Sequence, residues 1–231
     1  MIQLKQRYEQ VLANIASACL SSGRSTDSVE LVAITKNHPA SLVAELYELG
    51  HRVFGENRDQ EASKKASELG ELIPENQASW HFVGQLQSNK VKSVLSYAHT
   101  IHSIDRPSLV AELAKQLPKF DRAYSGFIEL NLTDDQGRGG VAPENLLELA
   151  DQVAKLPNFR LLGVMAVAGL GVDPRVDFDR ARSASEELKR LHPEAKYLSM
   201  GMSEDYQIAI AMGATHIRVG SAITGPRAYN A

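Results

Sequence analysis

The sequence predicts an α/β fold, a closed (β/α)8 barrel, and three observations lead to this fold class. Short apolar segments typical of buried parallel strands alternate with segments of helical period along the whole chain. Eight such units within 231 residues suit a closed barrel of the TIM type better than an open sheet. No linker or change of composition divides the chain, so we expect a single domain over residues 1–231.

The expected strands are apolar runs, many of them bounded by glycine, proline or polar turn residues. They lie at 31–36, 52–54, 79–83, 100–104, 123–132, 161–167, 197–200 and 216–219. The helices expected between them lie at 41–49, 58–69, 89–97, 105–117, 143–156, 176–191 and 204–212.

An additional helix is predicted before the first strand. Residues 2–20 carry apolar side chains at spacings of three and four, with polar residues between them. Cys19 lies on the apolar face of this helix, and we expect a small core residue there rather than a nucleophile. Only ten residues follow Ser221, too few for a long eighth helix, so we expect the N-terminal helix to close the outer ring.

Composition excludes several classes of function. The formal net charge is −3 and no lysine-rich tract is present, which argues against nucleic-acid binding. No apolar run approaches the roughly 20 residues that span a bilayer, and the N-terminus lacks the apolar core of a signal peptide. A single cysteine cannot form an intrachain disulfide, so we expect a cytoplasmic protein.

One lysine follows the first apolar run directly. Lys36 is expected at the carboxyl end of a buried strand, before the turn Asn37–Pro39, in which Pro39 suits the first position of a helix. Ligands bind at this edge of α/β folds, and a partly desolvated amine there is a usable nucleophile toward aldehydes. The alternative is that Lys36 only extends out of the strand end into water.

The last two strand ends predict an anion site. Ser203 is the expected N-cap of the helix after the seventh strand, and Gly220 and Ser221 open a short segment after the eighth. Backbone N–H groups at two adjacent helix starts, with glycines and hydroxyls beside them, suit a phosphate group. The alternative is that these residues form ordinary caps and turns.

Arg218 completes this constellation. It lies two residues before Gly220 on an apolar strand, where a guanidinium needs a partner. The partner could be a carboxylate such as Glu56, or an aromatic nitrogen of a ligand. A phosphate site, this arginine and a strand-end lysine together describe a site for pyridoxal 5'-phosphate (PLP), in which Lys36 forms a Schiff base with the aldehyde.

Other chemistries find less support. No cluster of histidine, cysteine and carboxylate residues has the spacing of a metal site. We expect His81 and His102 to be hydrogen-bonded residues near the core rather than acid–base catalysts.

Five motifs, in order along nearly the whole chain, resemble the pyridoxal phosphate homeostasis protein family. They are Ala33-Ile34-Thr35-Lys36, Phe54-Gly55-Glu56-Asn57, Trp80-His81-Phe82-Val83-Gly84, Leu198-Ser199-Met200-Gly201-Met202-Ser203 and Ile217-Arg218-Val219-Gly220-Ser221. This family has the barrel of alanine racemase, PLP fold type III, without the second β domain of that enzyme.

The resemblance implies a role for each matching position. Lys36 would form the Schiff base, and Arg218 would face the pyridine nitrogen. The phosphate would be held by Ser203, Gly220 and Ser221. Further contacts are implied for Asn57, Met165 and Met202. The chain departs from commoner members at Arg58, where an aromatic residue is frequent, and at Arg138, where a lysine is frequent.

We expect a carrier rather than an enzyme. An arginine facing the ring nitrogen keeps it unprotonated, which makes the ring a poor electron sink. The expected function is to bind PLP, buffer it and deliver it to apo PLP-dependent enzymes without turnover. The alternatives are a minimal amino-acid racemase and a phosphate-ligand module with an inert Lys36. Because no second domain requires a partner to complete the site, we expect a monomer.

Overall fold

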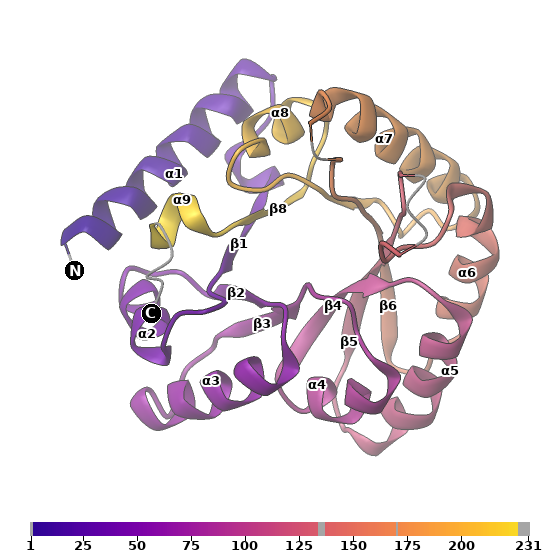
Figure 1. The fold of residues 1–231 in the computed structure, drawn as a ribbon, viewed down its shortest axis with the longest axis horizontal. Helices are drawn as coiled ribbons and strands as arrows, with labels where there is room; N and C mark the ends of the chain where they lie inside the picture. Colours follow the sequence, from indigo (N-terminus) through magenta and orange to yellow (C-terminus); the bar gives the residue numbers. More distant parts are fainter. Residues whose placement is uncertain (1, 134–136, 170, 226–231) are drawn as a thin grey trace.

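The computed structural model describes residues 2–133, 137–169 and 171–225, and its eight strands form one closed parallel barrel (Figure 1). The strands are β1 (Glu30–Ile34), β2 (Val53–Glu56), β3 (Ser79–Phe82), β4 (Ala98–Ile104), β5 (Tyr124–Glu129), β6 (Phe159–Met165), β7 (Tyr197–Ser199) and β8 (His216–Val219). They pair in chain order, and β8 returns to β1 with Ala33 opposite Val219. The predicted (β/α)8 barrel is confirmed.

Helices surround the barrel (Figure 1). They are α1 (Ile2–Ser21), α2 (Ala40–Glu48), α3 (Asp59–Leu72), α4 (Val91–Tyr97), α5 (Pro107–Gln116), α6 (Leu146–Val153), α7 (Pro174–Leu191), α8 (Tyr206–Ala211) and α9 (Ser221–Thr224). Short 3-10 turns are η1 (Thr26–Ser28), η2 (Ser88–Lys90), η3 (Leu117–Lys119) and η4 (Pro143–Asn145).

The main core lies between the strands and the outer helices. Phe54 and Phe178 are among its largest fully buried side chains. Burial of a side chain of this size contributes roughly 1.5–3 kcal/mol, so this layer is the principal source of stability. The strands are buried on both faces: after Glu30, every residue of β1 is buried.

The N-terminal helix takes the outer position expected of it. α1 lies beside α8 and α9 (Figure 1). Arg7 Nε donates to Ile223 O at 2.8 Å, and Asn14 Nδ2 donates to Tyr206 Oη at 3.1 Å. Cys19 is completely buried in this layer, as predicted.

Several element ends differ from the prediction. β1 ends at Ile34, so Lys36 lies in the turn beyond the strand rather than on it. Pro39 occupies the N-cap position of α2 instead of the first helical position. β5 ends at Glu129, and the chain then continues as an isolated bridge between Leu130 and Val141. In both strands the predicted run extends past the last ladder pairing, so periodicity alone places the strand end too late.

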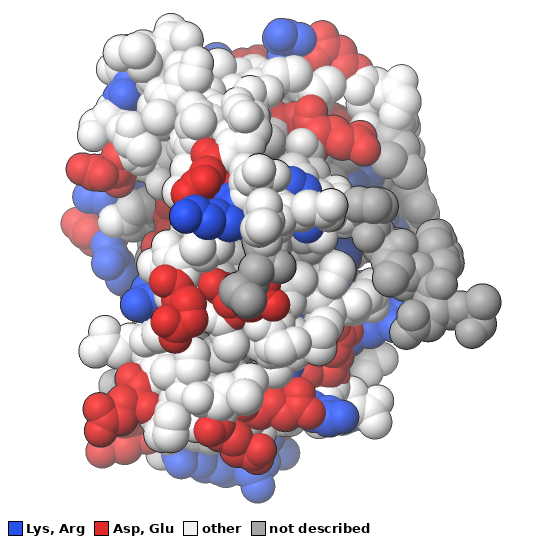
Figure 2. All heavy atoms as spheres, turned by 90° about the vertical axis from the view of Figure 1, so that its left-hand side faces the viewer, with Lys and Arg blue, Asp and Glu red and all other residues white. Residues whose placement is uncertain are grey.

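The surface carries charges of both signs. On the face drawn in Figure 2, acidic and basic side chains are interspersed and no continuous basic field is seen. No helix in the described ranges combines the length and apolarity needed to cross a membrane.

Candidate functional site

Lys36 lies at the rim of the barrel where the carboxyl ends of the strands meet. The turn that follows places Asn37 in the left-handed region at φ 64°, which asparagine tolerates better than most residues. Asn37 N donates to Glu61 Oε1 at 2.5 Å, so α3 holds this turn in place. The half-buried side chain of Lys36 makes no hydrogen bond or ion pair with any residue that the structure describes. Its amine is therefore free to meet a ligand.

A second lysine lies buried beneath that turn and is fully engaged. Lys65 Nζ contacts Glu56 Oε1 at 2.5 Å and Glu61 Oε1 at 2.9 Å, and it donates to Thr35 O at 2.8 Å. Thr35 Oγ1 also donates to Glu56, at 2.6 Å. The predicted alternative that Glu56 pairs with Arg218 is therefore wrong, because Glu56 is the partner of Lys65.

The turns after β7 and β8 are joined through Ser203. Its Oγ accepts hydrogen bonds from Gly220 N at 3.1 Å and Ala222 N at 3.3 Å. The predicted capping role of Ser203 is wrong: Asp205 holds the N-cap position of α8, and its carboxylate accepts from Met202 N at 2.6 Å. Ser203 instead points across to the start of α9, which brings hydroxyl and amide groups from two turns together.

Gly220 allows the close approach of these turns to β1. A Cβ at this position would lie 3.3 Å from Ile34 Cβ, tighter than an ordinary contact. Because the position is kept clear of a side chain, the backbone of β8 can lie against the strand that leads to Lys36. The next residue, Ser221, is exposed and opens α9.

Arg218 is a buried cation without a carboxylate partner. It is 5% exposed, and its two terminal nitrogens donate to Ser199 Oγ at 2.6 Å and to Ala166 O at 2.9 Å. Burial lowers the pKa of Arg218 to about 10, so the guanidinium stays charged at neutral pH. No ion pair joins it to an acidic residue in the described part of the chain. A guanidinium has five N–H groups, so donors remain for a ligand.

Two histidines extend the contacts of Arg218 into the barrel. Ser199 Oγ lies 2.9 Å from His102 Nδ1, and His102 Nε2 lies 2.9 Å from His81 Nδ1. Burial lowers the pKa of His81 to about 3 and lowers that of His102 well below its usual range, so both are neutral at pH 7. Since β4 and β7 are not neighbours in the sheet, the contact between His102 and Ser199 crosses the barrel interior.

These contacts define the tautomers. A guanidinium can only donate, so Ser199 Oγ accepts from Arg218. Ser199 can then donate its own proton to His102 Nδ1, which leaves the proton of neutral His102 on Nε2, where it is donated to His81 Nδ1. The prediction of hydrogen-bonded histidines near the core is confirmed. Sequence reasoning missed that they support Arg218, although all lie on strands predicted to form one barrel.

Glu129 is a site candidate that sequence reasoning also missed. It ends β5 at the rim, opposite Met165 of β6. Burial and the nearby charge of Asp105 raise its pKa to about 7, against the attraction of Arg218 and Arg138. Its position at the end of a strand could have identified it. The strand was predicted to continue to residue 132, so Glu129 was not placed at the strand end.

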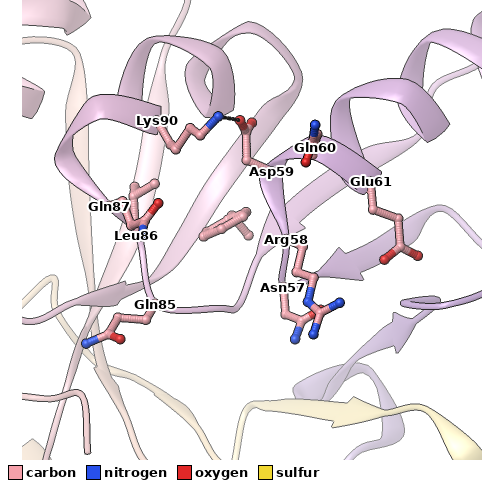
Figure 3. Close-up of a pocket in the computed structure, with 10 residues that line it drawn as sticks. Asn57, Arg58, Asp59, Gln60, Glu61, Gln85, Leu86, Gln87 and Lys90 are labelled. Carbon is pink, nitrogen blue, oxygen red and sulfur yellow. Dashed lines mark ion pairs between the residues drawn. The ribbon is translucent and has the colours of Figure 1, made fainter. Parts of the chain in front are cut away.

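A cavity of about 600 Å³ opens beside the rim at the ends of β2 and β3 (Figure 3). Its wall consists mainly of polar side chains from the turn after β2, the first turn of α3 and the segment after β3. They are Asn57, Arg58, Asp59, Gln60, Glu61, Phe82, Gln85, Leu86, Gln87 and Lys90. Asn57, which the resemblance implies as a cofactor contact, lies beside Arg58 in this wall (Figure 3).

The structure brings most of the predicted site residues to one edge of the barrel. Lys36, Ser203, Gly220 and Ser221 follow the adjacent strands β1, β7 and β8, and Arg218 lies just below the rim within β8. The side chains of the two methionines differ. Met202 is 40% exposed, whereas Met165 is buried at the end of β6. Arg138 donates to Val167 O and Ala168 O at 3.2 Å, so its guanidinium is committed to the loop after β6.

The fold and this rim define a barrel of the alanine racemase type. A family model described as alanine racemase, N-terminal domain, matches residues 9–228. An alanine racemase of Clostridium difficile 630 shares the fold, with a TM-score of 0.75 at 13% identity. All of this chain is covered in that comparison and 58% of the racemase.

Closer relatives narrow the assignment. A pyridoxal phosphate homeostasis protein of Aquifex aeolicus is 39% identical over 228 residues, covering 97% of this chain and 98% of the relative. One from Escherichia coli is 37% identical over 233 residues, covering 100% and 99%. PipY of Synechococcus elongatus, whose structure has PLP bound, is 36% identical with a TM-score of 0.80, covering 91% of this chain and 100% of PipY. The chain belongs to the pyridoxal phosphate homeostasis protein family.

Proposed function

We propose that this protein binds PLP and serves intracellular PLP homeostasis, holding the cofactor through Lys36, buffering it and delivering it. One observation carries the proposal. An amine without a partner among the described residues lies on the same rim as the joined turns at Ser203 and Gly220. The buried guanidinium of Arg218, on the neighbouring strand β8, forms no ion pair in that part of the chain. The names of the relatives and the PLP bound to PipY support the same function.

The residues present fit this cofactor. When bound, PLP supplies an aldehyde that condenses with a primary amine and releases water. Lys36 Nζ would supply the amine, and Arg218 would direct its remaining N–H groups at the pyridine nitrogen. The phosphate would lie against Ser203, Gly220 and Ser221, where the backbone approaches closely because Gly220 has no side chain. Asn57 and Met202 would form the adjoining walls.

Arg218 supports a carrier in preference to an enzyme. A guanidinium that stays charged at neutral pH keeps a proton off the nitrogen that it faces. A ring held in this form withdraws electrons weakly, so binding is favoured over carbanion chemistry. We propose no catalytic turnover. The protein would act in the cytoplasm as a monomer, since all the proposed contacts come from one chain, and would pass the cofactor to apo PLP-dependent enzymes.

The covalent part of this proposal is tested by trapping. The purified protein with PLP is expected to be yellow, and borohydride is expected to fix one cofactor on the peptide that contains Lys36. Lys36→Ala should lose both the colour and the label. Lys64→Ala, a control at an exposed lysine of α3 that pairs with Glu68, should keep both. Equal labelling of the two variants would show that Lys36 is not the attachment site.

Delivery and turnover need separate measurements. Mixing the loaded protein with an apo PLP-dependent enzyme should restore activity of that enzyme while the yellow colour of the donor declines. No exchange of the α-hydrogen of alanine for deuterium is expected in heavy water. Steady exchange that Lys36→Ala abolishes would contradict the carrier and support the racemase.

A further inference from the structure

The cavity between the ends of β2 and β3 shares Asn57 with the proposed PLP site, and its other lining residues have no role in that proposal. It lies on the other side of Lys36 from the phosphate residues, because β1 stands between β2 and β8 in the barrel. Glu61 lines this cavity and also accepts from Asn37 N at 2.5 Å. A single hydrogen bond therefore connects the cavity wall to the turn that carries Lys36.

The acidic groups of the wall already have cationic partners. Asp59 lies 3.7 Å from Lys90 Nζ, and Glu61 lies 2.9 Å from Lys65 Nζ. The guanidinium of Arg58, in contrast, forms no hydrogen bond or ion pair with any residue in the described ranges, although its main-chain carbonyl accepts from Ala62 N at 3.0 Å. The wall thus contains one guanidinium charge that the protein does not neutralise.

Arg58 lies on the side of the cavity nearest the barrel mouth. Its side chain runs next to that of Asn57, directed away from the pair formed by Asp59 and Lys90 (Figure 3). Gln85 forms the facing part of the wall, and a Cβ on Gly139 would lie 3.3 Å from its Nε2. A charged guanidinium flanked by neutral amides is suited to a carboxylate, which it can bind through two parallel hydrogen bonds.

Resting on the proposed function, we propose that this cavity admits amino acids, or other primary amines that carry a carboxylate, and that Arg58 selects them by binding the carboxylate. The bound amine would then displace Lys36 from the cofactor. Its nitrogen forms a bond to the carbon held by Lys36, the bond from that carbon to Lys36 Nζ breaks, and the two hydrogens of the neutral incoming amine end on Nζ. No oxidant, reductant or water is consumed.

This inference gives the carrier a means of release. Lys36 lies between the two parts of the rim, so an amine in the cavity approaches it from the β2 side while the phosphate stays against β7 and β8. Amines without a carboxylate would enter the same cavity but would not gain the contact with Arg58. We therefore expect Arg58 to increase the rate of reaction with glycine and not the rate with glycinamide, its amide.

The experiment compares glycine with glycinamide, which differ only in the carboxylate. The protein is first loaded with PLP, and loading is verified by borohydride labelling of Lys36. Each amine is then added, and the second-order rate is followed by the change in absorbance and by loss of the label that borohydride fixes on the protein. Arg58→Ala, Arg58→Lys and the exposed control Arg160→Ala are measured in the same way.

For Arg58→Ala we expect the rate with glycine to fall about tenfold while the rate with glycinamide stays the same, as loss of a charged hydrogen bond requires. Arg58→Lys should be intermediate, and Arg160→Ala should match the parent protein. Equal losses with both amines, or no loss with either, would overturn the inference. Failure of the parent protein to load at Lys36 would instead overturn the proposed function, and it would be seen before any amine is added.

Discussion

Lys65 and Arg218 are both buried cations at the rim of this barrel, and their surroundings differ in one respect. Lys65 is 3% exposed and contacts two carboxylates, those of Glu56 and Glu61. Arg218 is 5% exposed, and within the described ranges its guanidinium bonds only to the hydroxyl of Ser199 and the carbonyl of Ala166. Lys65 is neutralised within the protein, whereas Arg218 keeps a charge that a ligand can use.

The difference separates a structural charge from a functional one. A charge out of water is costly unless it is paired, so the carboxylates around Lys65 are needed for folding. Burying the charged guanidinium of Arg218 with uncharged partners destabilises the folded protein. An electron-rich ligand atom bound to the guanidinium would offset this loss of stability. Substitutions at the two cations should therefore affect different quantities.

The largest effect is expected where the buried ion pair loses its acid. Glu56→Gln leaves Lys65 with Glu61 alone, and we expect the free energy of unfolding to fall by about 3–5 kcal/mol. Urea unfolding measures this quantity. Glu68→Gln, which removes the exposed pair with Lys64, is the matched control and should cost about 0.5 kcal/mol or less. A loss below about 1 kcal/mol for Glu56→Gln would contradict the claim that the pair of Lys65 and Glu56 is needed for folding.

Glu129, a partly buried carboxyl at the rim, should contribute to the pH dependence of stability. Folding raises the pKa of Glu129 from 4.5 to about 7, so the folded state holds a proton that the unfolded state releases in that range. The contribution of Glu129 to stability is therefore expected to fall as the pH rises from 4.5 to 7, by up to about 3 kcal/mol. The buried neutral histidines His81 and His102 contribute in the opposite direction, because the unfolded state protonates them below about pH 6.5.

Glu129→Gln tests this assignment, because glutamine has no proton to lose. The change in unfolding free energy from pH 5 to pH 7.5 should therefore be more positive in the variant than in the parent protein. An unchanged pH dependence in the variant would show that folding does not raise the pKa of Glu129.

Arg218→Met should weaken PLP binding far more than it weakens the fold. We expect the dissociation constant for PLP to rise roughly 10- to 100-fold, corresponding to the loss of charged hydrogen bonds. Equilibrium dialysis measures the binding, and urea unfolding measures the stability. If Arg218→Met lowered stability as much as Glu56→Gln and left PLP binding unchanged, the charge of Arg218 would serve folding and not the ligand.

The smallest effect is expected at the hydroxyl that supports Arg218. Ser199→Ala removes the partner of both Arg218 and His102, so we expect about 1–3 kcal/mol lower stability and a rise in the dissociation constant for PLP smaller than that of Arg218→Met. Ser125→Ala is the control, since its hydroxyl bonds to Thr100 Oγ1 and contacts neither Arg218 nor His102 among the described residues. A pH titration of the absorbance of bound PLP provides a second measurement, which should change for Ser199→Ala alone.

Much of this architecture was predictable because it depends on local patterns. Alternating apolar runs and helical periods predicted eight strands in one closed barrel, since parallel strands joined by helices leave few other arrangements. The position of Lys36 at the rim followed from the same pattern. Strand ends were predicted less well: β5 ends at Glu129 because ladder pairing stops there, which an apolar run does not reveal.

The sequence by itself determined the fold class and the edge at which the chemistry-bearing residues gather, because both follow from periodicity along the chain. Only the tertiary structure decided which charges are neutralised. Lys65 meets Glu56 across nine residues, and His102 meets Ser199 across 97. Such contacts depend on strand register and on side chains that face one another across a closed barrel. They separate a buried cation that stabilises the protein from one that is left for a ligand.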